Sequence, residues 1–163
     1  MADILTQERV REVLEYDPET GICRWLVTLS HRAMAGSVAG SITPKGYRAI
    51  YIDRRNCLLH RIIWLYVFGT APKQIDHKNG IRCDNRLSNL REATSSQNGG
   101  NQRRPRNNTS GFKGVHLAGD RWRARIVINR RSISLGMFAT PDEAHTAYMN
   151  AAVTAWNNFA RAE

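Results

Sequence analysis

Strict alternation of apolar and charged residues is clearest over residues 121–128, Arg-Trp-Arg-Ala-Arg-Ile-Val-Ile. Successive side chains of a strand point to opposite faces, so this segment predicts a strand with one apolar face and one face of arginines. A turn at 129–130 and a returning segment at 131–135 predict a hairpin, and 112–117 predicts a strand before it. The pattern therefore predicts three antiparallel strands in this part of the chain.

Helical spacing of apolar residues follows a strong start signal at Thr140, which opens a capping box that closes at Glu143. Small residues, mainly Ala, then recur at helical intervals and let a helix lie close to a sheet. We expect this helix to cover the apolar face of the three strands. Two further helices are predicted earlier in the chain, one capped by Thr6 and a short buried one over 60–68 that ends at Gly69.

The first 59 residues carry weaker signals. Residues 22–27 and 46–53 predict strands, with a turn at 54–56 after the second. We assign this segment a structural role or a contact with nucleic acid, and no chemistry. Together the patterns predict an α+β protein.

Charge changes the picture most in the middle of the chain. Lys and Arg number 24 and Asp and Glu 14, a net charge of +10, and residues 99–135 hold nine of the basic residues against the single acid Asp120. Such a balance points to a polyanionic partner, first of all nucleic acid. Residues 99–111 contain no apolar side chain, so they predict a flexible basic linker between two domains.

Several classes of protein are excluded. The apolar run at 62–68 is too short to span a bilayer, and the acidic amino terminus is not a signal peptide. The cysteines at 23, 57 and 83 form no Cys-x-x-Cys pair, so we expect no disulfide framework and no zinc. A reducing, cytoplasmic compartment fits this composition, and a membrane partner is not expected.

Candidate chemistry lies in the pair Asp76-His77. A carboxylate is a hard oxygen ligand that suits Mg²⁺ or Mn²⁺, and a neutral imidazole can take a proton from water near neutral pH. Neighbours on a strand face opposite ways, so both serve one site only if the strand ends there. The turn residues at 78–80, Lys-Asn-Gly, predict that bend.

The segment 75–98 resembles the HNH endonucleases, with His77, Asn89 and Asn98 at the three motif positions. The resemblance implies a ββα-metal site, in which a strand hairpin, a long loop and a helix hold one divalent ion. It also implies that Asp76 and Asn98 bind the ion, that His77 activates water, and that Asn89 orients His77.

The same segment contains the Asn-Asn-Arg-x-x-Asn-Leu run of the phage-borne branch of that family, with Asp84 in place of the first Asn. The helix that carries Asn98 would be capped by Thr94 and ended by the glycines at 99–100. We take three further residues as structural parts of the motif: Asn85, Arg86 and His60.

A second resemblance covers residues 110–156, which look like the DNA-binding domain of the APETALA and ethylene-response factors. That family lays a three-stranded sheet in the major groove of duplex DNA, and Trp122 is expected on the apolar side of the sheet here. The positions that the resemblance assigns to DNA are Lys113, His116, Arg121, Arg123, Arg125 and Arg131. The linker would follow phosphates with Arg103, Arg104 and Arg106.

The sequence thus predicts a phage-encoded HNH endonuclease of homing type that hydrolyses double-stranded DNA with one divalent ion, by a nick or a double-strand cut. Its parts would be an α/β segment over 1–59, the nuclease core over 60–98, the linker over 99–111 and the DNA-binding sheet and helix over 112–163. A monomer and a DNA-bound dimer both remain open, and the protein would act in the cytoplasm of the host bacterium.

Other functions fit less well. A catalytically silent DNA-binding regulator could use the same two domains, but the intact set of Asp76, His77 and Asn98 argues against it. RNA binding is disfavoured because the basic sheet lacks exposed aromatic pairs that stack unpaired bases. Binding to a membrane surface is disfavoured because the charge lies on a strand and a linker rather than on an amphipathic helix.

Overall fold

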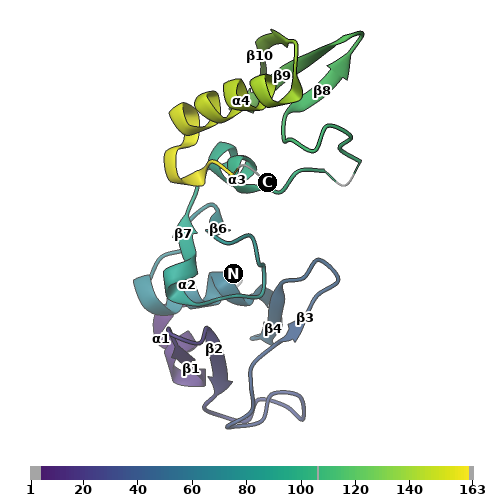
Figure 1. Ribbon diagram of the computed structural model, residues 1–163. Helices are drawn as coiled ribbons and strands as arrows, with labels where there is room; N and C mark the ends of the chain where they lie inside the picture. The colour runs from purple at the N-terminus through teal and green to yellow at the C-terminus, as the bar shows by residue number, and fades with distance from the viewer. Residues whose placement is uncertain (1–4, 106, 162–163) are drawn as a thin grey trace. The chain divides into compact units, whose positions relative to one another are not determined.

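The computed structural model describes residues 5–105 and 107–161. The chain forms two compact units, Met1–Glu92 and Ala93–Glu163, and both combine helices with antiparallel sheets (Figure 1). The α+β class predicted from the sequence is confirmed. Over the described ranges, no helix combines the length and the apolar character needed to cross a membrane.

The described part of the first unit contains two α-helices and three small antiparallel sheets, which pair β1 with β2, β4 with both β3 and β5, and β6 with β7. Its elements in chain order are α1 (Gln7–Val13), β1 (Leu14–Asp17), β2 (Ile22–Trp25), β3 (Ser41–Ile42), β4 (Arg48–Ile52), β5 (Arg55–Leu58), α2 (Leu59–Phe68), β6 (Ile75–His77), a 3₁₀ turn (Leu87–Asn89) and β7 (Leu90–Glu92).

One hydrophobic cluster joins the elements of this unit. It brings Val10 and Val13 of α1 together with Trp25, Ile52 and Ile63 from three other elements. Thr6 caps α1 by accepting a hydrogen bond from the backbone N–H of Arg9, as the sequence predicts. Gly69 ends α2 in the left-handed conformation, also as predicted.

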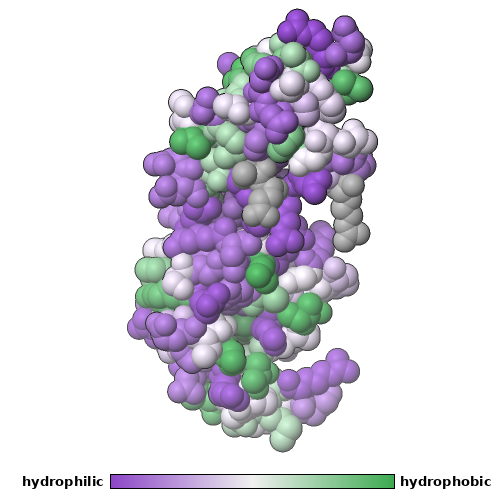
Figure 2. Space-filling model, in the orientation of Figure 1, coloured by the Kyte–Doolittle hydropathy of each residue, from purple (hydrophilic) through white to green (hydrophobic). Residues whose placement is uncertain are grey.

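Hydrophobic side chains also reach the surface of the first unit, but in separate small patches among polar residues (Figure 2). Leu26, Met34 and Tyr51 are among them, and they come from different loops and strands. Scattered exposure of this kind is normal for a globular surface and marks no docking site.

The second unit is a three-stranded antiparallel sheet, in the order β10-β9-β8, with a long helix lying along one face (Figure 1). Its elements are α3 (Ser95–Asn101), β8 (Val115–Ala118), β9 (Arg121–Ile128), β10 (Arg131–Phe138), α4 (Pro141–Trp156) and a 3₁₀ turn (Asn157–Phe159). The prediction of three strands with a helix over their apolar face is therefore confirmed. Ala124 and Ile126 of β9 are buried with Tyr148 and Ala152 of α4.

Local signals explain α4 almost completely. The Thr140 hydroxyl accepts a hydrogen bond from the backbone N–H of Glu143 at 3.3 Å. The Glu143 carboxylate reaches back one residue further than expected and accepts from the N–H of Ala139 at 3.1 Å. Trp122 is partly buried and packs on the helix side of the sheet, as predicted.

Several predicted boundaries are wrong. The strands expected over 22–27, 46–53 and 131–135 span 22–25, 48–52 and 131–138. The turn expected at 54–56 lies at Asp53 and Arg54, which both take positive φ, and the following residues form β5. The strand expected over 112–117 begins only at Val115. The glycines at 99–100 do not end their helix, because α3 continues to Asn101, so the predicted linker is helical at its start.

Candidate active site and DNA interface

The pair Asp76-His77 lies at the end of β6, in the antiparallel hairpin that β6 forms with β7. Asp76 pairs with Arg91 across the hairpin and His77 with Leu90. The chain turns immediately after His77, whose carbonyl accepts a hydrogen bond from the N–H of Gly80 at 2.8 Å. Gly80 takes a φ of 70°, which favours glycine, so the bend predicted from Lys-Asn-Gly is present.

The imidazole of His77 is 5% exposed and is held by Asn85. The distance between His77 Nε2 and Asn85 Oδ1 is 3.1 Å. Because an amide oxygen can only accept, Nε2 is the donor and the lone pair of the neutral ring lies on Nδ1. Burial lowers the pKa of His77 from its ordinary value, although the hydrogen bond to Asn85 acts in the opposite direction. The lowered pKa favours the neutral ring at neutral pH.

We expected Asn89 to orient His77, and the structure shows a different arrangement. The side chain of Asn89 bonds to the loop backbone instead: its oxygen accepts from the N–H of Asn79 at 3.0 Å, and its amide donates to the carbonyl of Asp84 at 2.7 Å. Asn85 takes the place beside the histidine. Asn89 thus fixes the loop between β6 and β7, which also carries Asn85.

The Asp84 side chain also stabilises this loop. Its carboxylate forms an ion pair with Arg86 at 2.6 Å and accepts a hydrogen bond from the Asn79 amide at 2.7 Å. The Arg86 guanidinium is the largest of the causes that lower the pKa of Asp84 to about 2. The position where the sequence departs from the phage-type run therefore holds a charged residue with a clear structural role.

Two aromatic rings pack around His77. The His60 ring from α2 lies 5.0 Å from it, centroid to centroid, in an edge-to-face arrangement, and the Tyr47 ring lies 6.0 Å away. His60 is buried, as expected of a structural residue, and burial lowers its pKa to about 4. These rings exclude water from one side of His77.

Asp76 is buried and ion-paired. Its Oδ2 atom lies 2.8 Å from both Nε and Nη2 of Arg91, which is its cross-strand neighbour. A carboxylate oxygen and the amide oxygen of an asparagine are hard donors that suit Mg²⁺ or Mn²⁺. The donor types fit a small divalent cation, which would share Asp76 with Arg91. The described residues include no group of three or more His, Cys, Asp or Glu placed to hold a metal.

The amino-terminal segment, for which the sequence predicts no chemistry, supports the loop. The hydroxyl of Tyr16 donates to the carbonyl of Asn85 at 2.9 Å, and the carbonyl of Pro18 accepts from the N–H of Leu87 at 3.0 Å. A Cβ on Gly21 would lie 2.4 Å from the backbone nitrogen of Arg86, so only glycine fits there. Residues 16–21 therefore act as a support for Asn85.

Asn98, the other expected metal ligand, lies on α3 in the second unit, because the boundary between the units falls just before Ala93. Thr94 caps this helix in a complete capping box with Gln97, as predicted for the cap residue. A helix of seven residues that contains two glycines is weak by itself. Its stability must come from the packing around it.

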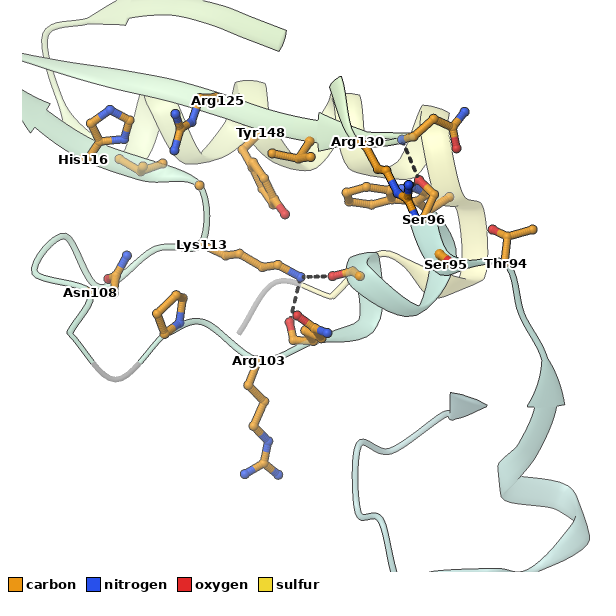
Figure 3. Close-up of a pocket in the computed structure, with 18 of the residues that line it drawn as sticks. Thr94, Ser95, Ser96, Arg103, Asn108, Lys113, His116, Arg125, Arg130 and Tyr148 are labelled. Carbon is orange, nitrogen blue, oxygen red and sulfur yellow. Dashed lines mark hydrogen bonds between the residues drawn. The ribbon is translucent and has the colours of Figure 1, made fainter. Parts of the chain in front are cut away.

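That packing comes from α4 and from Lys113. The Ser96 hydroxyl accepts from the indole N–H of Trp156 at 2.9 Å. At the other end of α3, the Lys113 ammonium donates to the carbonyls of Gly100 and Gln102 at 2.6 Å and of Gly99 at 3.2 Å (Figure 3). We expected Lys113 to contact DNA; its three donors are instead used to cap α3.

Gly100 faces the Trp156 indole, where a Cβ would lie only 2.7 Å from the ring, whereas a Cβ on Gly99 would meet nothing within 4 Å. We predict that Gly100→Ala lowers the free energy of unfolding by about 1–3 kcal/mol through overpacking. Gly99→Ala is the matched control and should raise it by up to about 1 kcal/mol through helix propensity. Chemical denaturation of both variants measures this, and equal effects would contradict the packing described here.

The face of the sheet opposite α4 is basic. Strand pairing places His116 across from Arg123, and Arg121 and Arg125 share the face with Arg123. Arg131 differs, because it pairs with Ile128, whose side chain points to the helix side. Arg131 therefore does not join the arginines of β9 as the sequence analysis expected.

The structure describes two of the three linker arginines that the sequence assigns to DNA. Arg103 and Arg104 are exposed, and Arg106 lies outside the described residues. Side-chain hydrogen bonds order the second part of the segment that we predicted to be flexible. The Asn108 amide donates to the carbonyl of Phe112 at 2.8 Å, and the Ser110 hydroxyl donates to the carbonyl of Val115 at 2.7 Å. The chain is thus fixed by side-chain bonds before β8 begins.

Residues 57–99 match the HNH endonuclease family. Protein 3.8 of Escherichia phage T7 is 35% identical over 86 residues, which are 50% of this chain and 69% of the phage protein. The chain belongs to the protein 3.8 family. No solved structure matches it.

In this member of the protein 3.8 family, the HNH match includes every residue that we assigned to the nuclease site: Asp76, His77, Asn89 and Asn98. The match also continues from the first unit into α3 of the second. The nuclease motif of this family member is therefore divided between its two units.

Proposed function

We propose that this protein is a metal-dependent DNA endonuclease of homing type, made of an HNH nuclease core and a fused DNA-binding sheet. The observation that carries the proposal is the buried His77, which lies at the strand end of an HNH-matching segment and is bonded through Nε2 to Asn85. As a phage-family protein it would act inside the infected bacterium.

His77 would take a proton at Nδ1 from the water that attacks the phosphodiester. Asn85 orients the ring through Nε2, and His60 and Tyr47 keep bulk water from its side. Asn89 would act indirectly by holding the loop that carries Asn85.

Asp76 and Asn98 are the residues that we assign to the divalent ion, Mg²⁺ or Mn²⁺. The bound ion would supply positive charge to stabilise the phosphate and the leaving 3′ oxygen. Arg91 keeps the Asp76 carboxylate in one orientation through its two bonds to Oδ2.

The basic face of the sheet would bind duplex DNA. Arg121, Arg123 and Arg125 are spaced along one strand, and His116 extends the face to β8. Arginines on a strand can donate to phosphates for affinity and to base edges for sequence preference. Apart from an Arg121 bond to the carbonyl of Met137, no hydrogen bond of the described residues uses these guanidinium groups.

Conversion of supercoiled plasmid by the purified protein tests this function. We predict nicked or linear product with Mg²⁺ or Mn²⁺, none with excess chelator, and ends with 5′-phosphate and 3′-hydroxyl groups. Tight duplex binding without cleavage under any divalent ion would instead show a catalytically silent DNA-binding regulator.

A further inference from the structure

The second unit contains a cavity of about 930 Å³, which is at the large end of the range for sites that hold small ligands. It lies beside the first turn of α3, and its wall includes the segment after that helix, the start of β8 and the β9–β10 turn (Figure 3). All of its lining residues belong to this one unit.

The charged side chains at this cavity are all basic. Arg103, Arg125, Arg130 and His116 line it from four different segments, and no lining residue is acidic. Among the described residues, no carboxylate, carbonyl or hydroxyl bonds to the guanidinium groups of the three arginines. Three uncompensated guanidinium groups around one cavity favour an anionic occupant.

Lys113 does not add to this set, since its ammonium is used by the carbonyls at the end of α3. The remaining wall is partly apolar. Val127 is 52% exposed, and the Tyr148 and Trp156 rings form part of the interior. An occupant with both phosphate and apolar parts matches this lining better than an inorganic anion does.

We propose that this cavity binds a nucleotide segment of a DNA strand, with phosphates on Arg103, Arg125 and Arg130 and the sugar against Val127. The inference rests on the proposed function and adds a second DNA contact to the sheet face. It replaces the DNA contacts that the sequence predicts for Arg104 and Arg131, because Arg103 lines the cavity whereas these two arginines do not. Arg104 and Arg131 therefore have no DNA contact under this proposal.

The cavity lies beside α3, the helix that carries the proposed metal ligand Asn98. Thr94, Ser95 and Ser96 line the cavity and belong to the cap and first turn of α3, and Asn98 follows on the same helix. A strand held in the cavity is therefore held next to the helix that carries a proposed metal ligand. DNA binding by the second unit would in this way bring a phosphodiester next to α3, which carries the last residue of the HNH motif.

Neighbouring arginines provide a matched test. The pocket pair, Arg103→Gln with Arg130→Gln, and the control pair, Arg104→Gln with Arg131→Gln, remove equal charge from adjacent exposed positions. Binding of a labelled short duplex to the full chain is measured by anisotropy across a salt series in chelator, so that cleavage plays no part. We expect the pocket pair to lower the slope of log affinity against log salt by about 1.8, for two lost phosphate contacts, and the control pair to leave it nearly unchanged.

Each other outcome overturns the inference. Equal slopes for the two pairs would show general charge attraction. If dTMP binds the wild type and only the pocket pair abolishes this, while both pairs bind duplex alike, the cavity holds a free nucleotide and not a DNA strand. Plasmid cleavage by the wild type is measured separately, so a protein that binds through the cavity but never cuts would refute the nuclease function and leave the cavity assignment intact.

Discussion

His77→Ala is expected to lower DNA cleavage by about 10²–10⁴-fold, the usual contribution of a positioned acid–base group. Duplex binding should stay near the wild-type value, because the basic sheet face and the cavity of the second unit are unchanged. Single-turnover cleavage and anisotropy on the same preparation measure the two effects. Near-normal cleavage by a folded His77→Ala sample would refute the assignment.

Substitution of Asn85 and of Asn89 by alanine should have different effects, because only Asn85 bonds to His77. Asn85→Ala removes the bond to His77 Nε2 and should lower kcat while KM changes little. Asn89→Ala leaves the N–H of Asn79 and the carbonyl of Asp84 without their partner, so it should lower the free energy of unfolding by about 1–3 kcal/mol. If Asn89→Ala lowered kcat at unchanged stability, the orienting role first expected of Asn89 would be restored.

Lys113→Met should destabilise the protein and slow its cleavage without changing its phosphate contacts. The variant keeps the aliphatic stem but removes the ammonium from the carbonyls of Gly99, Gly100 and Gln102. Hydrogen bonds to a charged group contribute about 1.5–3 kcal/mol each, so denaturation should show a loss of at least that size. Cleavage should fall with it, because α3 carries Asn98.

The salt series distinguishes this role from a contact with DNA. If Lys113 contacted a phosphate, its loss would lower the slope of log affinity against log salt by about 0.9 at unchanged stability. Loss of a helix cap instead lowers the stability and leaves the slope as it was. Arg104→Gln, at an exposed position outside the cavity, is the control for general loss of charge.

Much of the second unit could be predicted because its signals are local. The alternation over β9 defined its length, and Thr140 and Pro141 defined the start of α4. In the first unit, β5 was missed because its hairpin turn uses Asp53 and Arg54 at positive φ rather than Asn-Gly, so the usual turn signal is absent.

The candidate site was predictable only as far as the motif reaches. Asp76 and His77 could be found from residue types and the bend after them. The partner of His77 could not, because Asn85 and Asn89 lie in one irregular loop and only the folded loop decides which amide meets the ring. The role of Tyr16 depends on a contact with a residue 69 positions away in the sequence, and that of Lys113 on contacts with residues at least 11 positions away. No local sequence pattern indicates such contacts.

The dependence of α3 on Trp156 and Lys113 limits how this protein can be recombined with its relatives. A chimaera joined after α3, within residues 102–111, would keep this helix but remove the ammonium that caps it and the indole against which Gly100 packs. A joint placed ahead of Ala93 would keep that helix with its support, although it would transfer Asn98 together with the sheet that we propose to bind DNA. If the proposed function holds, an exchange of target preference between such proteins therefore has to transfer part of the HNH motif as well.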